Sequence, residues 1–239
     1  MDTVIKRADE RTTIRMEWLT SRHSFPFAGN FDLHRGGHGV LLVNNDDIMA
    51  PGGSFDRHQH KDMEIITWVM SGEVVHEDST GNTLRIPARS AQRMTAGSGI
   101  SHAERSLSRE GEDIRVVQMW AAPDTNGLEP SYEQADFSRE LASGELFVVA
   151  SGLPKHVGSP GIGLANKYAA LYAARLPEGR SITVPSAPFV HVYLAEGTAT
   201  LGDEVLAAGD SARITSGGGQ ALTATSESEI LIWEMYAHF

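Results

Sequence analysis

Residues 55–79 read FDRHQHKDMEIITWVMSGEVVHEDS and combine two closely spaced histidines with the pattern of β-strands. The apolar, β-branched run at residues 63–70 predicts a buried strand, and Ser71 and Gly72 predict the turn that ends it. Residues 74–78 predict the next strand. Short strands separated by Gly- and Pro-rich turns, about every 8–12 residues, continue through most of the chain, which is typical of an all-β sandwich or barrel.

Two pairs of potential metal ligands lie in this β-patterned block, His58 with His60 and His102 with Glu104. Residues i and i+2 of a strand point to the same face, roughly 6.5–7 Å apart along the strand. Both side chains of a pair can therefore reach one ion through bonds of about 2.0–2.2 Å. Three imidazoles and one carboxylate suit Fe(II), Mn, Ni, Cu or Zn, because these ligands discriminate weakly among first-row metals. One His-x-His pair alone is equally well explained as two surface histidines, and the second pair favours a metal site.

Length and composition restrict the class of protein. The 239 residues allow one large all-β domain or two domains of ordinary size. The absence of cysteine excludes a disulfide framework and thiolate chemistry, and it is typical of a reducing compartment, so we expect a cytoplasmic protein. The net charge of −11 disfavours direct nucleic-acid binding. The polar N-terminus and the lack of an apolar run of about 20 residues predict neither a signal peptide nor a membrane span.

The second half of the chain repeats the pattern of the first. An apolar strand reaches a turn at Gly72, and a similar strand reaches a turn at Gly197. Such a repeat predicts two copies of one supersecondary unit. Measured from matching turns, the positions of the four candidate ligands are occupied in the second copy by Thr183, Pro185, Leu222 and Ala224. These side chains cannot replace the ligands, so we expect a metal site in the first half only.

Composition divides the chain into three parts. Residues 1–125 are predicted to form a β-domain with the metal site, and residues 146–239 a β-domain without metal ligands. The Pro-rich and polar residues 126–145 are predicted to form a linker with a short helix near residues 129–137. Residues 23–31, HSFPFAGNF, are predicted to form a loop that covers a sheet.

On these residues the chain resembles the pirins, two-domain members of the cupin superfamily, and most of all the bacterial pirins that include quercetin dioxygenases. The specific matches are residues 55–82 and the motif MTAGSGISHAE at residues 94–104, with support from residues 21–32, 43–47 and 117–123. The resemblance implies an all-β bicupin, in which two jelly-roll β-barrels pack together, and a mononuclear metal that is usually Fe. One departure is RSAQ at residues 89–92, where the usual turn has glycine.

The resemblance also assigns roles to individual residues. The family's metal ligands carry over onto His58, His60, His102 and Glu104. Glu64 falls where many other cupins have a ligand carboxylate, and in pirins this position implies a supporting or structural role. Gln118 matches a polar residue near the family's pocket. From the strand pattern alone, His76 and Glu77 could lie near the site, but they are better explained as an exposed pair on a strand.

The function that the resemblance implies is a dioxygenase that uses Fe(II) to cleave a flavonol such as quercetin with O2. Mn, Ni, Cu, Co or Zn could replace the iron. Glu104 would accept the proton of the flavonol hydroxyl, because a weakly held carboxylate can be both ligand and base. The expected partners are a small planar polyphenol and O2, and the chain is expected to be a monomer.

Two other functions remain open. The resemblance also implies a metal- or redox-sensing regulator that binds a protein partner, either a transcription factor or a metabolic enzyme. The third possibility is a barrel that the metal only stabilises, which four ligands saturating the ion would favour. Whether added flavonol is consumed together with oxygen discriminates between the dioxygenase and the other two functions.

Overall fold

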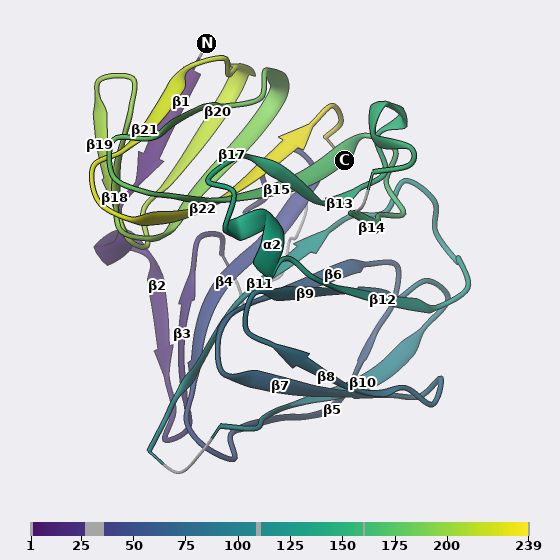
Figure 1. Ribbon diagram of the computed structural model, residues 1–239. Coiled ribbons are helices and arrows are strands. Elements are labelled where there is room, and N and C mark those ends of the chain that lie inside the picture. The colour runs from purple at the N-terminus through teal and green to yellow at the C-terminus, as the bar shows by residue number, and fades with distance from the viewer. Residues whose placement is uncertain (1, 27–35, 109–110, 160, 239) are drawn as a thin grey trace.

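The computed structural model describes residues 2–26, 36–108, 111–159 and 161–238. The chain forms two β-barrels, one above the other in Figure 1, and each combines a seven-stranded with a four-stranded sheet. The single turn of helix α2 (Ser138–Leu141) lies between them. This arrangement confirms the predicted all-β architecture. No helix in the described ranges is long and apolar enough to cross a membrane.

The barrel in the lower half of Figure 1 is formed by the N-terminal half of the chain. Its larger sheet contains, in spatial order, β12 (Ser131–Asp136), β9 (Ser90–Thr95), β6 (Glu64–Ser71), β11 (Ile114–Ala121), β4 (Leu41–Met49), β3 (Leu19–His23) and β2 (Thr12–Arg15). Its smaller sheet contains β5 (Ser54–His60), β10 (Ile100–Ser106), β7 (Glu73–Asp78) and β8 (Thr83–Pro87).

The second barrel is formed mainly by the C-terminal half. Its larger sheet contains β1 (Asp2–Lys6), β20 (Ser211–Gly217), β17 (Ala187–Glu196), β22 (Ser228–Met235), β15 (Ala169–Leu176), β13 (Phe147–Ser151) and β14 (Ile162–Gly163). Its smaller sheet contains β16 (Ser181–Thr183), β21 (Ala221–Ala224), β18 (Thr198–Leu201) and β19 (Glu204–Ala207). Two 3₁₀ turns, η1 (Ala8–Glu10) and η2 (Pro154–His156), lie in connections.

The predicted internal repeat is confirmed by the order of the strands. Strands β9, β6, β11, β4 and β3 are neighbours in the first barrel in the same order as β20, β17, β22, β15 and β13 in the second. Gly72 and Gly197 occupy equivalent turns with φ of 76° and 81°. A Cβ atom would lie 2.2 Å from Cγ2 of Ile114 at the first glycine, and 2.1 Å from the carbonyl oxygen of Glu227 at the second. Both turns therefore require glycine.

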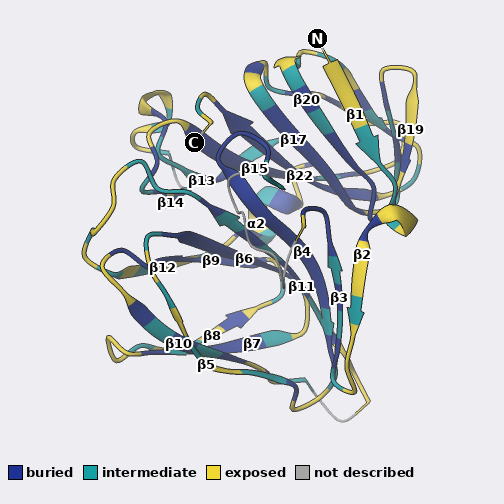
Figure 2. Cartoon of the chain, turned by 180° about the vertical axis from the view of Figure 1, so that it is seen from behind, coloured by how far each residue is buried: buried dark blue, intermediate teal, exposed yellow. Residues whose placement is uncertain are grey.

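The two barrels are joined by a shared apolar core between their larger sheets. Trp68 of the first barrel and Tyr193 and Trp233 of the second belong to one buried cluster, and each is 0% exposed. Figure 2 shows strands on both sides of this junction, such as β4 and β22, as mostly buried. Burying side chains of this size stabilises the association by roughly 1.5–3 kcal/mol each, which makes the pair of barrels one packed unit.

The first strand does not follow the boundary drawn from composition. β1 pairs in antiparallel register with β20 of the second barrel, for example Val4 with Arg213, although residues 2–6 lie in the segment assigned to the first barrel. The next strand, β2, returns to the first barrel and pairs with β3. The N-terminal segment therefore crosses the junction, which composition alone does not reveal.

The helix predicted near residues 129–137 is wrong. Residues 131–136 form β12, which pairs along its whole length with β9. Its residues have intermediate or high helix propensity, but pairing with a sheet edge satisfies the backbone hydrogen bonds of the segment and overrides that weak preference. The helical turn comes later, at α2, where Oδ1 of Asp136 accepts a hydrogen bond of 2.7 Å from the backbone N–H of Ser138.

The predicted covering loop at residues 23–31 lies only partly within the described residues. His23 ends β3, and Phe25 packs in the core between the barrels at 3% exposure. The remainder of the loop, from residue 27 onward, lies outside the described residues.

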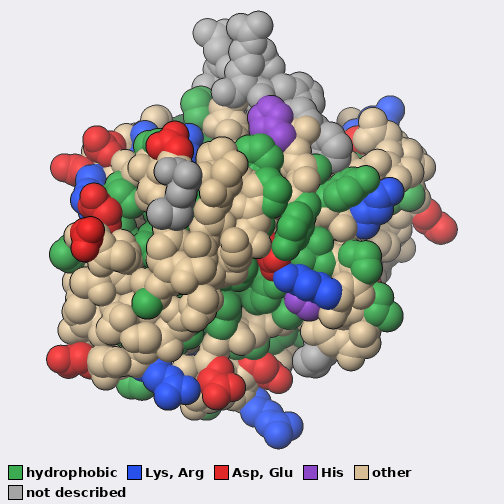
Figure 3. Space-filling model, turned by 90° about the horizontal axis from the view of Figure 1, so that it is seen from above, with side chains coloured by type: hydrophobic (Ala, Val, Ile, Leu, Met, Phe, Trp, Pro, Cys, Tyr) green, Lys and Arg blue, Asp and Glu red, His purple; other side chains and the backbone are tan. Residues whose placement is uncertain are grey.

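On the face seen from above, charged side chains are dispersed. Viewed from above, the face formed by the second barrel carries acidic and basic side chains that are interspersed with apolar ones (Figure 3). Among the described residues this face shows no continuous basic patch. Such a distribution does not favour the neutralisation of phosphates on this face.

Candidate metal centre

Strands β5 and β10 bring the three predicted histidine ligands together. The strands are antiparallel neighbours, and His102 lies directly opposite His58 in their register. The ring centroids are 4.7 Å apart for His58 and His60, 4.5 Å for His58 and His102, and 5.0 Å for His60 and His102. One ring nitrogen from each residue lies within 4.8 Å of the other two. This arrangement can hold one ion.

The hydrogen bonds of these rings leave nitrogens available to an ion. Nδ1 of His58 lies 2.7 Å from the backbone carbonyl oxygen of Asp56 and donates to it, which leaves Nε2 as the bare nitrogen. Nε2 of His60 and Nε2 of His102 are buried and have no hydrogen-bond partner among the described residues. Buried polar atoms are nearly always satisfied. Two such atoms beside a third available nitrogen therefore fit a metal ion.

Burial keeps two of these imidazoles neutral. Burial, with smaller contributions from the charges of neighbouring histidines, lowers the pKa of His60 and of His102 to about 3. A metal ion binds only the neutral ring, whose lone pair is free. At neutral pH both side chains are thus in the form that binds a metal.

Glu104 lies on the same strand as His102, beyond an irregularity in the pairing of β10 with β5, and is 3% exposed. Three side chains donate hydrogen bonds to its carboxylate. Oε1 accepts from Nε2 of Gln92 at 2.5 Å and from Oγ1 of Thr67 at 3.3 Å. Oε2 accepts from Nε2 of Gln118 at 2.8 Å and keeps lone-pair capacity for a further partner.

The carboxylate belongs to a second, overlapping group of ligand atoms. An oxygen of Glu104 and one ring nitrogen each of His76 and His102 lie within 4.8 Å of one another. His102 is shared with the group of three histidines. Glu104 therefore approaches the centre from the side of His102, inside the barrel.

The donors to Glu104 belong to a row of polar side chains across the larger sheet. In register, this row contains Gln92, Thr67, Gln118, Asn45 and His23. The corresponding row of the second barrel contains Ala212, Val192, Ile232, Tyr172 and Val148. The same fold thus encloses polar groups in the first barrel and a mostly apolar core in the second.

The two further pocket residues predicted from sequence lie in different places. Gln118 reaches the site, because it donates to Glu104. Glu64 lies three residues before Thr67 on β6, and hence on the opposite face of that strand. Its Oε2 accepts a hydrogen bond of 3.0 Å from the backbone N–H of Ala165 in the second half of the chain. The structure therefore places Glu64 at the junction of the barrels.

The prediction that His76 and Glu77 form an exposed pair is wrong for His76. Its side chain is 0% exposed and its Nδ1 lies 3.4 Å from Nδ1 of His102. Glu77 points the other way and forms a partly exposed ion pair with Arg105. The alternation of faces along a strand separates the two neighbours, and this period was the signal that could have placed His76 inside.

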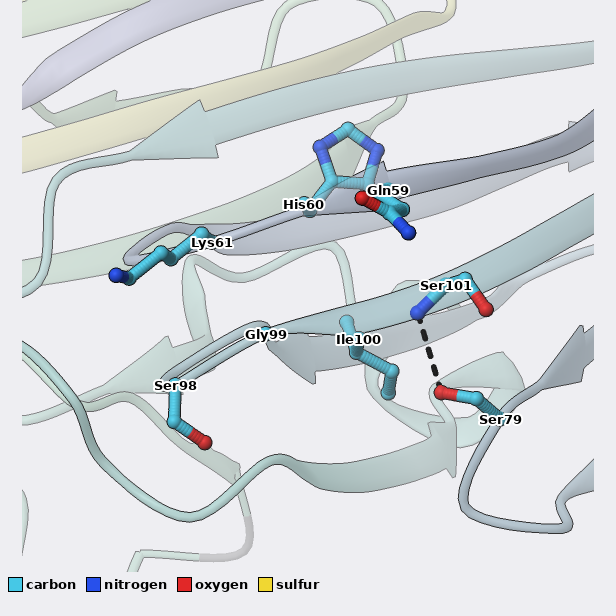
Figure 4. Close-up of a pocket in the computed structure, with 8 residues that line it drawn as sticks. All are labelled: Gln59, His60, Lys61, Ser79, Ser98, Gly99, Ile100 and Ser101. Carbon is cyan, nitrogen blue, oxygen red and sulfur yellow. Dashed lines mark hydrogen bonds between the residues drawn. The ribbon is translucent and has the colours of Figure 1, made fainter.

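A cleft of about 470 Å³ opens beside the centre. Among the three histidines of the candidate site, only His60 lines it. Figure 4 shows the His60 ring on one side of the cleft, with Ser98 and Ile100 on the other. The remaining lining residues are Gln59, Lys61, Ser79, Gly99 and Ser101. Small molecules can thus approach the site at the end of β5, over a surface to which polar and apolar atoms both contribute.

Asp47 gives a pH-dependent prediction for the first barrel. It lies on β4 opposite Ser21, and burial raises its pKa from 3.8 to about 7, with smaller contributions from the charges of Asp46 and Glu104. As the pH rises, Asp47 loses its proton in the unfolded state before it does so in the folded state. The carboxyl group therefore lowers the stability of the folded protein progressively from about pH 4 to pH 7, and the loss is complete above about pH 7. Asp47→Asn is expected to raise the free energy of unfolding by about 4 kcal/mol at about pH 8 and to change it little at about pH 4.

Thermal melting at both pH values measures this difference. An increase in melting temperature of equal size at both pH values would contradict the ionisation argument and would point to a packing effect of the amide instead.

Two family models match the chain, one over most of each barrel. The model described as Pirin matches residues 5–121. The model described as Quercetinase C-terminal cupin domain matches residues 162–235.

Relatives match over nearly the whole length. A Mycobacterium bovis protein is 45% identical over 98% of this chain and 95% of its own, and the quercetin 2,3-dioxygenase activity in its name is provisional. A quercetin 2,3-dioxygenase of Escherichia coli is 32% identical over 97% of both chains. The crystal structure of the Escherichia coli bacterial pirin YhhW in complex with nickel(II) superposes with a TM-score of 0.87 at 30% identity, covering 99% of this chain and 100% of that one.

Proposed function

Since this chain belongs to the pirin family, we propose that it is a metal-dependent dioxygenase that cleaves a flavonol such as quercetin with O2. The observation that carries the proposal is the group of three histidines with available nitrogens beside a buried, hydrogen-bonded carboxylate. Relatives over the full length are named for this activity, and a solved relative holds a nickel ion. Together they support a catalytic centre in the first barrel.

The proposed ligands are His58, His60, His102 and Glu104. Imidazole and carboxylate accept several first-row metals, so the donor set is compatible with Fe(II), our first choice, and with Mn, Ni, Cu, Co or Zn. When bound, the ion supplies Lewis acidity that lowers the pKa of a coordinated hydroxyl group and provides positions for substrate. The side chains of the protein supply the rest of the chemistry.

Glu104 is the proposed general base. Oε2 has one hydrogen-bond donor and can accept the proton of the flavonol 3-hydroxyl, whereas Oε1 has two donors. The donors Gln118, Gln92 and Thr67 fix the carboxylate between them, so that it meets the substrate in one orientation. The activated flavonol then reacts with O2, and its central ring is cleaved with loss of CO.

Apolar side chains next to His60 are suited to a planar ring system. The Trp120 ring lies edge-on to His60, with centroids 4.9 Å apart. Trp120 packs against a buried cluster that includes Met63 and Ile100. An aromatic substrate that enters beside His60 would displace water from this surface, which strengthens the hydrogen bonds inside the site.

Metal content and aerobic quercetin turnover, measured on one preparation of the full chain, test the proposal. We expect about one iron-group ion per chain, with consumption of quercetin and O2 and release of CO. His58→Ala removes one of three imidazoles, and should remove both the metal and the turnover. Turnover that persists in a metal-depleted His58→Ala protein would refute the proposed centre.

The alternative function predicts a different outcome of the same experiment. If the wild-type protein binds metal but consumes neither flavonol nor oxygen, a metal- or redox-sensing regulator becomes the better proposal. A protein partner would then be sought by comparing the reduced with the oxidised protein. If no metal binds after reconstitution, both proposals fail.

A further inference from the structure

A buried chain of polar side chains continues from His102 away from the proposed ion. Strand β7 lies next to β10, and in their register Asp78 is opposite His102 and His76 is opposite Glu104. Nδ1 of His76 lies 3.4 Å from Nδ1 of His102, and Nε2 of His76 lies 3.1 Å from Oδ2 of Asp78. The side chains of His76 and Asp78 are both 0% exposed. Hydrogen bonds thus connect the carboxylate of Asp78 to the imidazole of His76 and this imidazole to that of His102, and solvent does not reach His76 or Asp78.

Asp78 is the fixed end of this chain. Oδ1 accepts hydrogen bonds from the backbone N–H and the hydroxyl of Thr80, at 2.8 and 2.7 Å, and Oδ2 accepts from Nδ2 of Asn82 at 2.8 Å. Burial alone would raise the pKa of Asp78, but the hydrogen bonds from Asn82 and Thr80 hold it well below its usual value. The carboxylate therefore remains ionised and can only accept hydrogen bonds.

The hydrogen bonds from Asp78 through His76 to His102 determine which ring nitrogens carry no proton. Because Asp78 only accepts, Nε2 of His76 must carry the proton between them. A neutral imidazole has one N–H, so Nδ1 of His76 is bare and accepts from Nδ1–H of His102. Nε2 of His102 is then bare, and this is the buried nitrogen with no hydrogen-bond partner among the described residues. In this arrangement neither nitrogen of His76 is available to an ion, because Nε2 carries a proton and the lone pair of Nδ1 accepts the hydrogen bond from His102.

We propose that His76, anchored by Asp78, is a positioning residue that sets the tautomer and the orientation of His102 so that Nε2 faces the metal. The inference rests on the metal centre of the proposed function and assigns a role to two residues outside its ligand set. His58 obtains the same orientation from a backbone carbonyl, that of Asp56, which no side-chain substitution removes. His102 depends instead on a side chain, and it belongs to both groups of ligand atoms.

Partners of this kind commonly change metal affinity by roughly 10–100-fold when they are removed. His76→Leu removes the acceptor for His102 at similar volume, and we expect the Zn(II) dissociation constant of the full chain to rise by about that factor. His76→Asn places an amide oxygen near the position of Nδ1 and can still accept from His102. It should stay within about threefold of the wild type. His76→Gln extends towards Asp78 instead and should behave like His76→Leu.

Competition with a chromophoric chelator measures these Zn(II) affinities, and Co(II) absorption spectra report whether the ligand geometry is preserved. Glu77→Gln is the matched control, because Glu77 lies on the same strand but points outward to Arg105. It should leave both readouts unchanged. Thermal melting of the metal-free proteins shows whether each variant folds, and if His76→Leu does not fold, the contrast between the Asn and Gln variants decides.

Equal Zn(II) affinity in the wild type and in the Leu and Gln variants would overturn the positioning role. Equal weakening in the Asn, Gln and Leu variants would also overturn it, since only the Asn variant keeps the acceptor. No flavonol enters this experiment, so the two proposals can fail separately. A wild-type chain that binds Zn(II) but never consumes quercetin refutes the dioxygenase and leaves the role of His76 intact.

Discussion

Glu104→Gln is expected to lower flavonol turnover by about 100-fold or more while most of the metal stays bound. The three histidines that can hold the ion are unchanged, because their ring nitrogens lie within 4.8 Å of one another without the carboxylate. The proton acceptor is lost, however, because an amide is not a base at neutral pH. Removal of a positioned general base typically costs roughly 10²–10⁴ in rate, and this range sets the size of the effect.

The surroundings of Glu104 make the amide a poor substitute in geometry as well. The carboxylate receives only donors, from Gln92, Thr67 and Gln118. An amide at this position must direct its own N–H groups towards one of them. Gln118 cannot turn its oxygen to the site without cost, because Oε1 already accepts a hydrogen bond of 3.1 Å from Nε1 of Trp120. The variant therefore loses hydrogen bonds in addition to its base.

Single-turnover rates and metal content, measured on the same protein, separate the two roles of Glu104. Glu64→Gln is the matched control, since Glu64 is also a buried carboxyl of the first barrel but contacts Ala165 at the junction. We expect its turnover to remain near that of the wild type. If Glu104→Gln loses metal and turnover in equal proportion, the carboxylate acts mainly as a ligand, and unchanged turnover would exclude it as the base.

Local patterns explain why the candidate ligands, of which the structure brings the three histidines together, stand out in the sequence. His58 with His60, and His102 with Glu104, are spaced for one face of a strand, and alternation along a strand needs no knowledge of the fold. The repeat was equally visible, because the glycines at 72 and 197 satisfy the same steric requirement in both barrels. Patterns of this kind depend only on residues that are close in the sequence, so they can be recognised without knowing the fold.

Two of the three donors to Glu104, Thr67 and Gln92, were not predicted, because strand pairing brings them in from elsewhere in the chain. Thr67 lies in an apolar run and looked like part of the core, yet it faces Glu104, 37 residues further on. Gln92 is adjacent to Thr67 only through the register of β6 and β9. Tertiary pairing also explains why residues 131–136 form a strand: pairing with the edge strand β9 outweighs their weak preference for a helix.

Asp46→Ala is expected to destabilise the folded protein by about 3–5 kcal/mol, as breaking a buried ion pair does. Arg115 donates to both oxygens of Asp46, at 2.9 and 2.7 Å, and Tyr193 of the second barrel donates its hydroxyl to the same carboxylate. Arg115 also donates to the backbone carbonyl of Ala195 at 2.7 Å. Removing Asp46 leaves a largely buried cation and a buried hydroxyl without their acceptor, at the junction between the two barrels.

The pH dependence of this loss distinguishes it from a packing defect. Burial alone would raise the pKa of Asp46, but the hydrogen bond and charge of Arg115 more than offset burial and lower it below 3.8. The stabilisation is therefore fully present above about pH 4 and is lost as the pH falls through the lower folded-state value. The difference between wild type and Asp46→Ala should shrink in acid, whereas a cavity would cost the same at every pH.

Calorimetry of the two variants at neighbouring positions provides the sharpest comparison. Asp46→Ala should lower the melting temperature near neutral pH by roughly 6–20 °C, given about 2–4 °C per kcal/mol for a chain of this size. Asp47→Asn, one residue further along β4, should raise it. The two shifts in melting temperature have opposite signs because successive residues of a strand face opposite sides. Asp46 faces the junction, where it contacts Arg115 and Tyr193. Asp47 faces the interior of the first barrel, where no cation among the described residues forms a hydrogen bond with it. A decrease in both variants would show that this part of β4 tolerates no substitution and that charge does not decide its stability.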